Sequence, residues 1–135
     1  MRRLIYISST RTTFTAGDLE EILRISRRNN AAVGVTGLLV AGGRRFLQVL
    51  EGAEGAIDAV FERIKQDPRH HAVVVLSRTD IAAPSFGEWS MGYARGGAVR
   101  GDATLPETVA QLLAPVTDPS LRGYFEGFAQ VHAAA

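Results

Sequence analysis

The sequence predicts an α+β fold, a mixed five-stranded sheet with two helices on one face. The predicted elements follow the order strand, helix, strand, strand, helix, strand, strand, and both helices are amphipathic. The two central strands are joined by a glycine-centred hairpin. Two right-handed β-α-β crossovers connected in this way place both helices on the same side, as in a ferredoxin-like sandwich.

The individual elements follow from apolar periodicity and from turn residues. Thr15 followed by Asp18 resembles a helix start, and the stripe of that helix facing the sheet includes the polar residues Ser26 and Asn30. Gly52 ends the second arm of the hairpin. The expected elements are strand 3–9, helix 16–30, a strand pair within 33–52, helix 54–66, strand 72–82 and strand 86–94.

A C-terminal extension follows the sandwich. We expect a domain over residues 1–95, a glycine-rich linker over 96–103 and a two-helix extension over 104–135. Its helices are expected over 105–113 and 120–133, and the second carries Tyr124, Phe125 and Phe128 at helical spacing. Two alternatives stay open for this apolar stripe, because it either is exposed for contact with another chain or covers the open face of the sheet.

Composition limits the function classes. The chain contains no cysteine, which excludes disulfides, thiolate metal sites and cysteine nucleophiles. Its formal net charge of +1 gives no general attraction for nucleic acid. The apolar run LIYI near the N-terminus is too short for a signal peptide or a membrane span, so we expect a cytoplasmic protein that does not bind membranes. His70 and His71 have no third ligand nearby, and no metal site is predicted.

One glutamine interrupts the apolar strand FLQVLEG. Gln48 shares a strand face with Phe46 and Leu50, so its amide is expected to be buried. A buried amide needs hydrogen-bond partners, because leaving its groups unpaired costs about 1–3 kcal/mol. Either the protein or a ligand supplies them, and the sequence leaves both alternatives open.

Four inward polar groups are expected to converge. Tyr6 lies on the first strand, which neighbours the strand of Gln48 in this fold, and Ser26 and Asn30 lie on the first helix. A slot between the two helices, walled by Ile22 and Ile64 with amides at its edges, suits a flat heteroaromatic ring. Taken singly, each polar residue also fits a simpler role: a core tyrosine, a helix cap or a glutamine bonded to a loop carbonyl.

The motifs LIYISS, SRRNNAAVGVTGLL, FLQVLEG, DPRHHAV and FGEWSMGY occur in the order and spacing of one family. The chain therefore resembles the BLUF family of flavin-binding blue-light sensor domains over about residues 2 to 95. Its helical C-terminal part resembles that of the short, single-domain members, which carry no fused enzymatic output. The resemblance implies a photoreceptor rather than an enzyme, with FAD held noncovalently between the two helices.

The resemblance also implies a role for particular residues. In the family, blue light drives electron and proton transfer from the tyrosine matched by Tyr6, and the hydrogen bonds of the glutamine matched by Gln48 reorganise by rotation or tautomerisation. Ser26, Trp89 and Met91 match positions that respond to this glutamine, so the fifth strand would carry the change to the C-terminal helices and on to an unknown partner protein or a homo-oligomer. The implied cofactor-binding residues are Tyr6, Ile22, Ser26, Asn29, Asn30, Gln48, Ile64, Arg69, His70 and Met91.

Two other classes use the same kind of fold. A light-independent ligand- or RNA-binding module would, in its RNA version, need exposed aromatic residues and a basic face on the central strands, and these strands supply one tyrosine and no interior basic residue. A small acylphosphatase-like hydrolase would need an anion-binding loop after the first strand. The segment SSTRTT offers Arg11 but no glycine-rich cradle.

Overall fold

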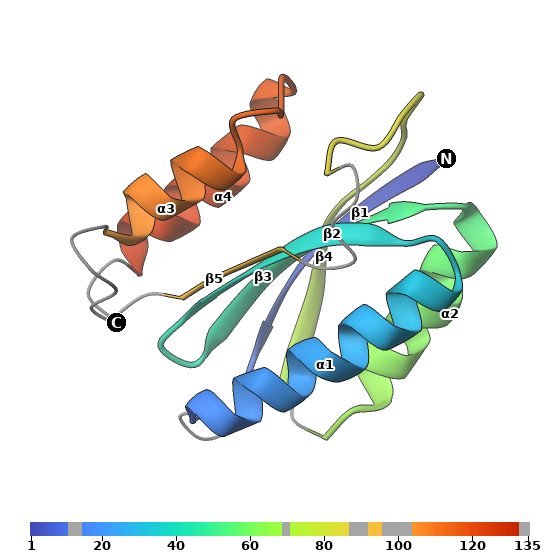
Figure 1. Ribbon diagram of the computed structural model, residues 1–135, viewed down its shortest axis with the longest axis horizontal. Coiled ribbons are helices and arrows are strands. Elements are labelled where there is room, and N and C mark those ends of the chain that lie inside the picture. The colour runs from blue at the N-terminus through green and yellow to red at the C-terminus, as the bar shows by residue number, and fades with distance from the viewer. Residues whose placement is uncertain (11–14, 69–70, 87–91, 96–103, 133–135) are drawn as a thin grey trace.

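The computed structural model describes residues 1–10, 15–68, 71–86, 92–95 and 104–132, and its elements follow the predicted order (Figure 1). The strands have the order β4-β1-β3-β2-β5. Strands β2 and β5 are parallel, while the other neighbouring pairs are antiparallel, so the sheet is mixed as predicted. The elements are β1 (Arg2–Ser9), α1 (Ala16–Ala32), β2 (Thr36–Gly42), β3 (Arg45–Gly52), α2 (Glu54–Gln66), β4 (His71–Asp80), β5 (Gly92–Arg95), α3 (Leu105–Leu112) and α4 (Pro119–Val131).

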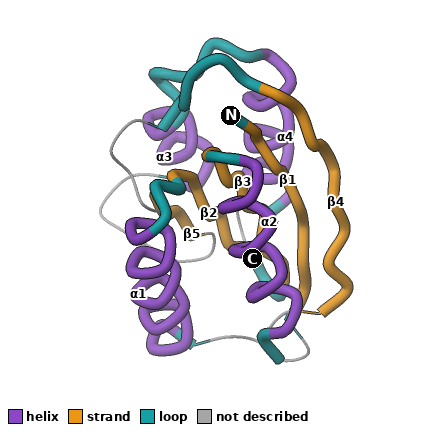
Figure 2. Tube along the Cα trace, turned by 90° about the vertical axis from the view of Figure 1, so that its right-hand side faces the viewer, coloured by secondary structure: helices purple, strands orange, loops and turns teal. Residues whose placement is uncertain are grey.

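The sheet separates two helical layers. Helices α1 and α2 cover one face, and α3 and α4 lie on the opposite face (Figures 1 and 2). The slot-side core lies under α1 and α2 and consists of Leu4, Tyr6, Leu19, Ile22, Leu23, Val35, Leu39, Ala41, Phe46, Leu50, Ile57, Val60 and Phe61. The C-terminal core lies under α3 and α4 and consists of Ile5, Leu38, Val40, Leu47, Val49, Phe86, Leu105, Val109, Leu113, Val116, Leu121, Phe125, Phe128 and Ala129.

Helix α1 has well-formed caps at both ends. The Thr15 hydroxyl accepts a bond from the backbone N–H of Asp18 at 3.1 Å, and the Asp18 carboxylate accepts one from the N–H of Thr15 at 2.9 Å. This reciprocal pair is the capping box that the sequence indicates. The helix ends two residues later than expected, just before Gly34, whose φ of 69° suits the left-handed conformation common after helix ends.

The hairpin between β2 and β3 has a two-residue loop. Gly42 pairs with Arg45, and Gly43 begins the loop with a φ of 60°, which glycine adopts without steric cost. A second glycine, Gly37, packs tightly within the same strand pair, because a Cβ there would collide with the carbonyl oxygen of Val49. The hairpin therefore fixes the register of β3, the strand that carries Gln48.

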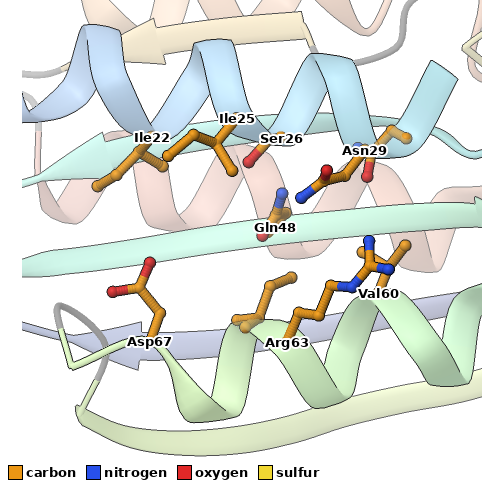
Figure 3. A pocket seen from close by; sticks show the side chains of 10 residues that line it. Ile22, Ile25, Ser26, Asn29, Gln48, Val60, Arg63 and Asp67 are labelled. Atoms are coloured by element: carbon orange, nitrogen blue, oxygen red, sulfur yellow. The ribbon is translucent and has the colours of Figure 1, made fainter. Parts of the chain in front are cut away.

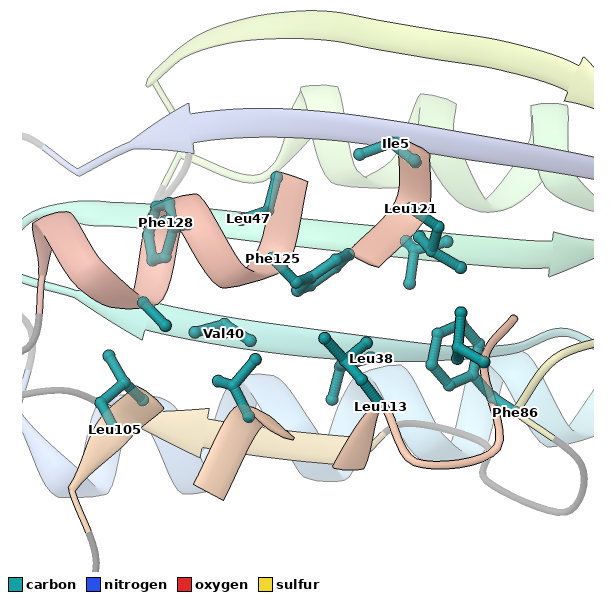
Figure 4. Close-up of a cluster of buried hydrophobic side chains, with 14 residues drawn as sticks. Ile5, Leu38, Val40, Leu47, Phe86, Leu105, Leu113, Leu121, Phe125 and Phe128 are labelled. Carbon is teal, nitrogen blue, oxygen red and sulfur yellow. The ribbon is translucent and has the colours of Figure 1, made fainter. Parts of the chain in front are cut away.

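The C-terminal helices cover the second face of the sheet (Figure 4). Phe125 is 0% exposed and Phe128 is 7% exposed, both within the C-terminal core, whereas Tyr124 is 38% exposed. Of the two alternatives for the apolar stripe, the exposed surface is therefore wrong for Phe125 and Phe128. Because α3 and α4 cover this face and α1 and α2 cover the other, the central strands β1 and β3 have no open face for an RNA-binding module.

The predicted boundaries differ from the observed ones by a few residues at helix and strand ends. Helix α3 ends one residue earlier than predicted, and α4 begins one residue earlier, because Asp118 caps it and Pro119 occupies its first turn. Strand β5 is described only over Gly92–Arg95, and the expected residues 87–91 and the linker 96–103 lie outside the described residues.

Candidate functional site

A buried phenol and a buried amide face each other on neighbouring strands. Tyr6 and Gln48 are directly paired in the β1–β3 ladder, and their side chains are 0% and 4% exposed. Residues paired in this way project to the same face of a sheet. The Tyr6 hydroxyl donates a hydrogen bond to Oε1 of Gln48. The structure thus joins the two side chains that the sequence placed on one face.

The environment of Tyr6 keeps its phenol protonated. The ring lies against Phe61 with a centroid distance of 5.2 Å. Burial raises the pKa of Tyr6 far above its ordinary value, and the negative charge of Asp67 raises that pKa further. At neutral pH the hydroxyl therefore carries its proton, as the bond to Gln48 requires.

Gln48 forms the floor of a slot between α1 and α2 (Figure 3). Helix α1 contributes one wall and α2 the other, and the space between them is partly open to solvent. The lining residues are Ile22, Ile25, Ser26, Asn29, Asn30, Gln48, Val60, Arg63, Ile64 and Asp67.

The structure brings together six of the predicted site residues around this slot: Ile22, Ser26, Asn29, Asn30, Gln48 and Ile64. Tyr6 does not line it and instead contacts it through Gln48. Arg69, His70, Trp89 and Met91 lie outside the described residues.

Four lining residues were not predicted: Ile25, Val60, Arg63 and Asp67. Helical spacing could have found most of them, since Ile25 and Asn29 are four residues apart on α1 and Val60 and Arg63 are three apart on α2. Asp67 follows as the C-cap of α2. Arg63 and Asp67 carry no signal in the sequence that separates them from charged residues facing solvent, which is where such residues usually lie.

The side chains around the slot suit a flavin. Amides at Asn29, Asn30 and Gln48 offer both donors and acceptors, which matches the carbonyl and N–H groups along one edge of an isoalloxazine ring. Ile22 and Ile64 present apolar surface suited to the faces of the ring. Arg63 adds a positive charge suited to a diphosphate. The residues present therefore fit FAD.

The described part of the chain offers neither a metal site nor a membrane-spanning helix. No group of three or more histidine, aspartate or glutamate side chains is placed to hold a metal ion there. Likewise, none of the described helices is long and apolar enough to cross a membrane.

The fold and the slot together define a domain suited to a planar aromatic ligand next to an oxidisable phenol. The comparisons with known proteins agree with this class. The family described as "BLUF: Sensors of blue-light using FAD" matches residues 1–92. The chain belongs to the BLUF family, whose domains are blue-light sensors that bind FAD.

Two relatives carry the matching region within much longer proteins. The blue light- and temperature-regulated antirepressor BluF of Escherichia coli is 38% identical over 88 residues, which are 65% of this chain and 22% of that protein. The photoactivated adenylate cyclase subunit beta of Euglena longa is 32% identical over 93 residues, 67% of this chain and 11% of that protein. The chain thus spans only a small part of these relatives.

A solved structure matches over nearly the whole chain. The dark-state structure of BlrB, a BLUF protein, has a TM-score of 0.72 and 28% identity, and the match covers 99% of this chain and 96% of that one. The match therefore includes the C-terminal helices. The chain thus corresponds over nearly its whole length to a BLUF protein of similar size.

Proposed function

We propose that light causes Tyr6 to give up an electron and a proton, and that Gln48 then changes its hydrogen bonds to the bound FAD. The observation that carries this proposal is the Tyr6–Gln48 hydrogen bond at the floor of the slot. When bound, a flavin supplies a blue-light-excited state that accepts an electron from a nearby phenol. A phenol that has lost an electron is strongly acidic, so its proton passes along the existing bond toward Oε1 of Gln48.

Gln48 suits a two-state role because an amide carries a donor and an acceptor on opposite sides of one carbon. Rotation about its last torsion exchanges the group that faces the slot, and tautomerisation converts the oxygen to a donor. Both alternatives change the hydrogen bond that the side chain offers to a ligand. Glutamate would add a charge, and leucine would offer no hydrogen bond.

The remaining residues of the slot hold and orient the ligand in this proposal. Ile22 and Ile64 pack on the faces of the ring, and Asn29 and Asn30 bond its polar edge. Ser26 lies one helical turn before Asn30, on the wall that faces Gln48. Arg69, His70 and Met91 are proposed as further FAD contacts on the basis of the family motifs.

The output of the domain is proposed to pass to its C-terminal helices. The fifth strand, with Trp89 and Met91 just before β5, would carry the change, and β5 contacts α3. From these helices the signal passes to a partner protein or to a second copy of the chain, for which Tyr124 offers an exposed aromatic side chain. A cytoplasmic location remains a prediction from the sequence.

The experiment is a light-minus-dark absorption spectrum of the purified protein. We expect flavin absorption that moves to longer wavelength under blue light and recovers in darkness. Gln48→Leu should retain the flavin and lose the shift, while Gln66→Leu, the same change at an exposed position, should keep it. An intact shift in Gln48→Leu would disprove the mechanism.

The role of Tyr6 is tested by the same spectrum. Tyr6→Phe removes the hydroxyl with little change of shape and should abolish the normal photocycle. Tyr124→Phe makes the same change on an exposed tyrosine and should leave the photocycle unchanged. A normal photocycle in Tyr6→Phe would exclude Tyr6 as the donor.

A further inference from the structure

The β1–β3 ladder carries a second polar pair on its opposite face. Arg3 is paired with Glu51, three positions along from the pairing of Tyr6 with Gln48. Because side chains alternate along a strand, an odd separation sends the two pairs to opposite faces. Arg3 is 6% exposed and Glu51 is 0% exposed. The same two strands thus hold a phenol–amide pair toward α1 and α2 and an ion pair toward α3 and α4.

The guanidinium of Arg3 binds three separate parts of the chain, because each of its nitrogens has its own partner. Nε donates to Oε2 of Glu51 at 2.8 Å, on β3. Nη1 donates to Oδ2 of Asp118 at 2.8 Å, at the start of α4, and Nη2 donates to Oγ of Ser85 at 2.9 Å, in the segment after β4. The backbone N–H of Ser85 in turn donates to Oε1 of Glu51 at 2.6 Å.

Asp118 links this cluster to the beginning of α4. Its other oxygen, Oδ1, accepts bonds from the backbone N–H groups of Ser120 at 2.9 Å and Leu121 at 3.3 Å, which caps the helix. The hydrogen bond from Arg3 is the largest cause that holds the pKa of Asp118 below its ordinary value. The carboxylate is therefore charged at neutral pH and caps α4 while it binds Arg3.

The Arg3–Glu51 ion pair is buried, whereas Asp118, bound to the same guanidinium, is 43% exposed. A buried ion pair depends strongly on geometry. Removing ions from water is costly, and the attraction offsets that cost only when the hydrogen bonds are well aligned. A small displacement of Glu51 therefore changes how well Arg3 holds Asp118. Glu51 lies on the same strand as Gln48, only three residues further on.

We propose that Arg3 is a positioning residue that couples the Tyr6–Gln48 pair to the C-terminal helices through strand β3. A rearrangement at Gln48 shifts β3, Glu51 moves with the strand, and the altered contact of Arg3 with Asp118 loosens the first turn of α4. This route rests on the proposed photochemistry and is additional to the fifth strand. In this proposal the Arg3 cluster has two arrangements. The state of the slot and the state of α4 each favour one of them.

The test uses Asp118→Asn in the full chain. Asparagine caps a helix as well as aspartate does, so α4 keeps its start, but the charge that binds Arg3 is lost. Two quantities are measured: the light-minus-dark absorption shift, and the rate of amide hydrogen exchange in the first turns of α4 in darkness and in light. The ratio of the light rate to the dark rate reports coupling, because a purely structural role changes both rates by the same factor.

For the unaltered protein we expect a ratio of at least about fivefold, the lower end of common coupling between sites. In Asp118→Asn the ratio should fall to near one with the absorption shift intact. Glu126→Gln removes another carboxylate of α4, which is paired with Arg122 at 3.2 Å away from the cluster, and should keep the full ratio. Glu51→Gln, on the strand side of the cluster, should behave as Asp118→Asn does.

Two results would overturn the coupling and leave the proposed function standing. One is an unchanged light-to-dark ratio in Asp118→Asn and Glu51→Gln. The other is an unaltered protein whose absorption shifts in light while exchange in α4 does not change. Failure of the proposed function has a different signature, which is the absence of any absorption shift in the unaltered protein.

Discussion

The two faces of the sheet differ in the side chains that lie between the sheet and its helices. Under α1 and α2 thirteen buried residues form a core that leaves a slot bordered by amides, whereas under α3 and α4 fourteen buried residues form an apolar cluster. One ion cluster, centred on Arg3, lies at its edge. The contrast separates two tasks: one face places amides around the slot beside the Tyr6–Gln48 pair, and the other attaches the helices that follow the sensor domain.

The largest expected effect tests the closely packed face. Phe125→Ala removes a side chain that is 0% exposed, and we expect a loss of about 3–5 kcal/mol in the free energy of unfolding, because a cavity remains. Urea unfolding followed by circular dichroism measures the loss. Tyr124→Ala, next to it but 38% exposed, should cost much less. Equal losses in the two variants would contradict the packing described here.

The next effect tests the slot face by pH. The folded Tyr6 keeps its proton above the pH at which an unfolded tyrosine loses it, about 10. Above about pH 10 the native state then binds more protons than the unfolded state. The contribution of Tyr6 to the free energy of unfolding is therefore fully present below about pH 10, and it falls above that pH by about 1.4 kcal/mol per pH unit. Urea unfolding between pH 9 and 12, as approximate limits, measures this slope. In Tyr6→Phe the free energy of unfolding should fall less steeply with pH, because the contribution of Tyr6 is absent. In Tyr124→Phe the contribution of Tyr6 to the slope should remain.

A smaller effect concerns the helix that forms one wall of the slot. Thr15→Ala removes the side-chain half of the capping box at the start of α1, and we expect a loss of about 1 kcal/mol. Thermal unfolding measures it. Thr15→Ser keeps a hydroxyl and serves as the control. Because the cap lies far from the C-terminal core, the effect of the double variant with Phe125→Ala should be additive.

The smallest effect lies on edge strand β4. Ala72 has a φ of 51°, where an alanine is strained by about 1 kcal/mol, so Ala72→Gly should raise stability by a few tenths of a kcal/mol after the entropy cost of glycine. Ala82→Gly, at an exposed residue outside the strands and helices and without a positive φ, should give no such gain. A clear loss of stability in Ala72→Gly would show that the strain is not present in solution.

The sequence allows the fold and the floor of the slot to be predicted, because both follow from local periodicity. Alternation along FLQVLEG placed Gln48 on the helix side, and the strand order placed Tyr6 beside it. The Arg3 cluster could not be predicted in this way. Arg3 and Asp118 are 115 residues apart, and neither has a local pattern that names its partner. Likewise, the apolar stripe of Phe125 and Phe128 leaves open from the sequence whether it faces another chain or covers the sheet.

The two-residue turn at Gly43 and Arg44 has a bearing on the photochemistry, although neither residue lines the slot. In a β-strand, a shift of register by one residue turns every side chain to the other face. One additional residue in this loop, if it displaced β3 by one position, would point Gln48 at α4 and bring Leu47 opposite Tyr6. The length of a surface turn thereby decides whether the phenol faces an amide or a hydrocarbon.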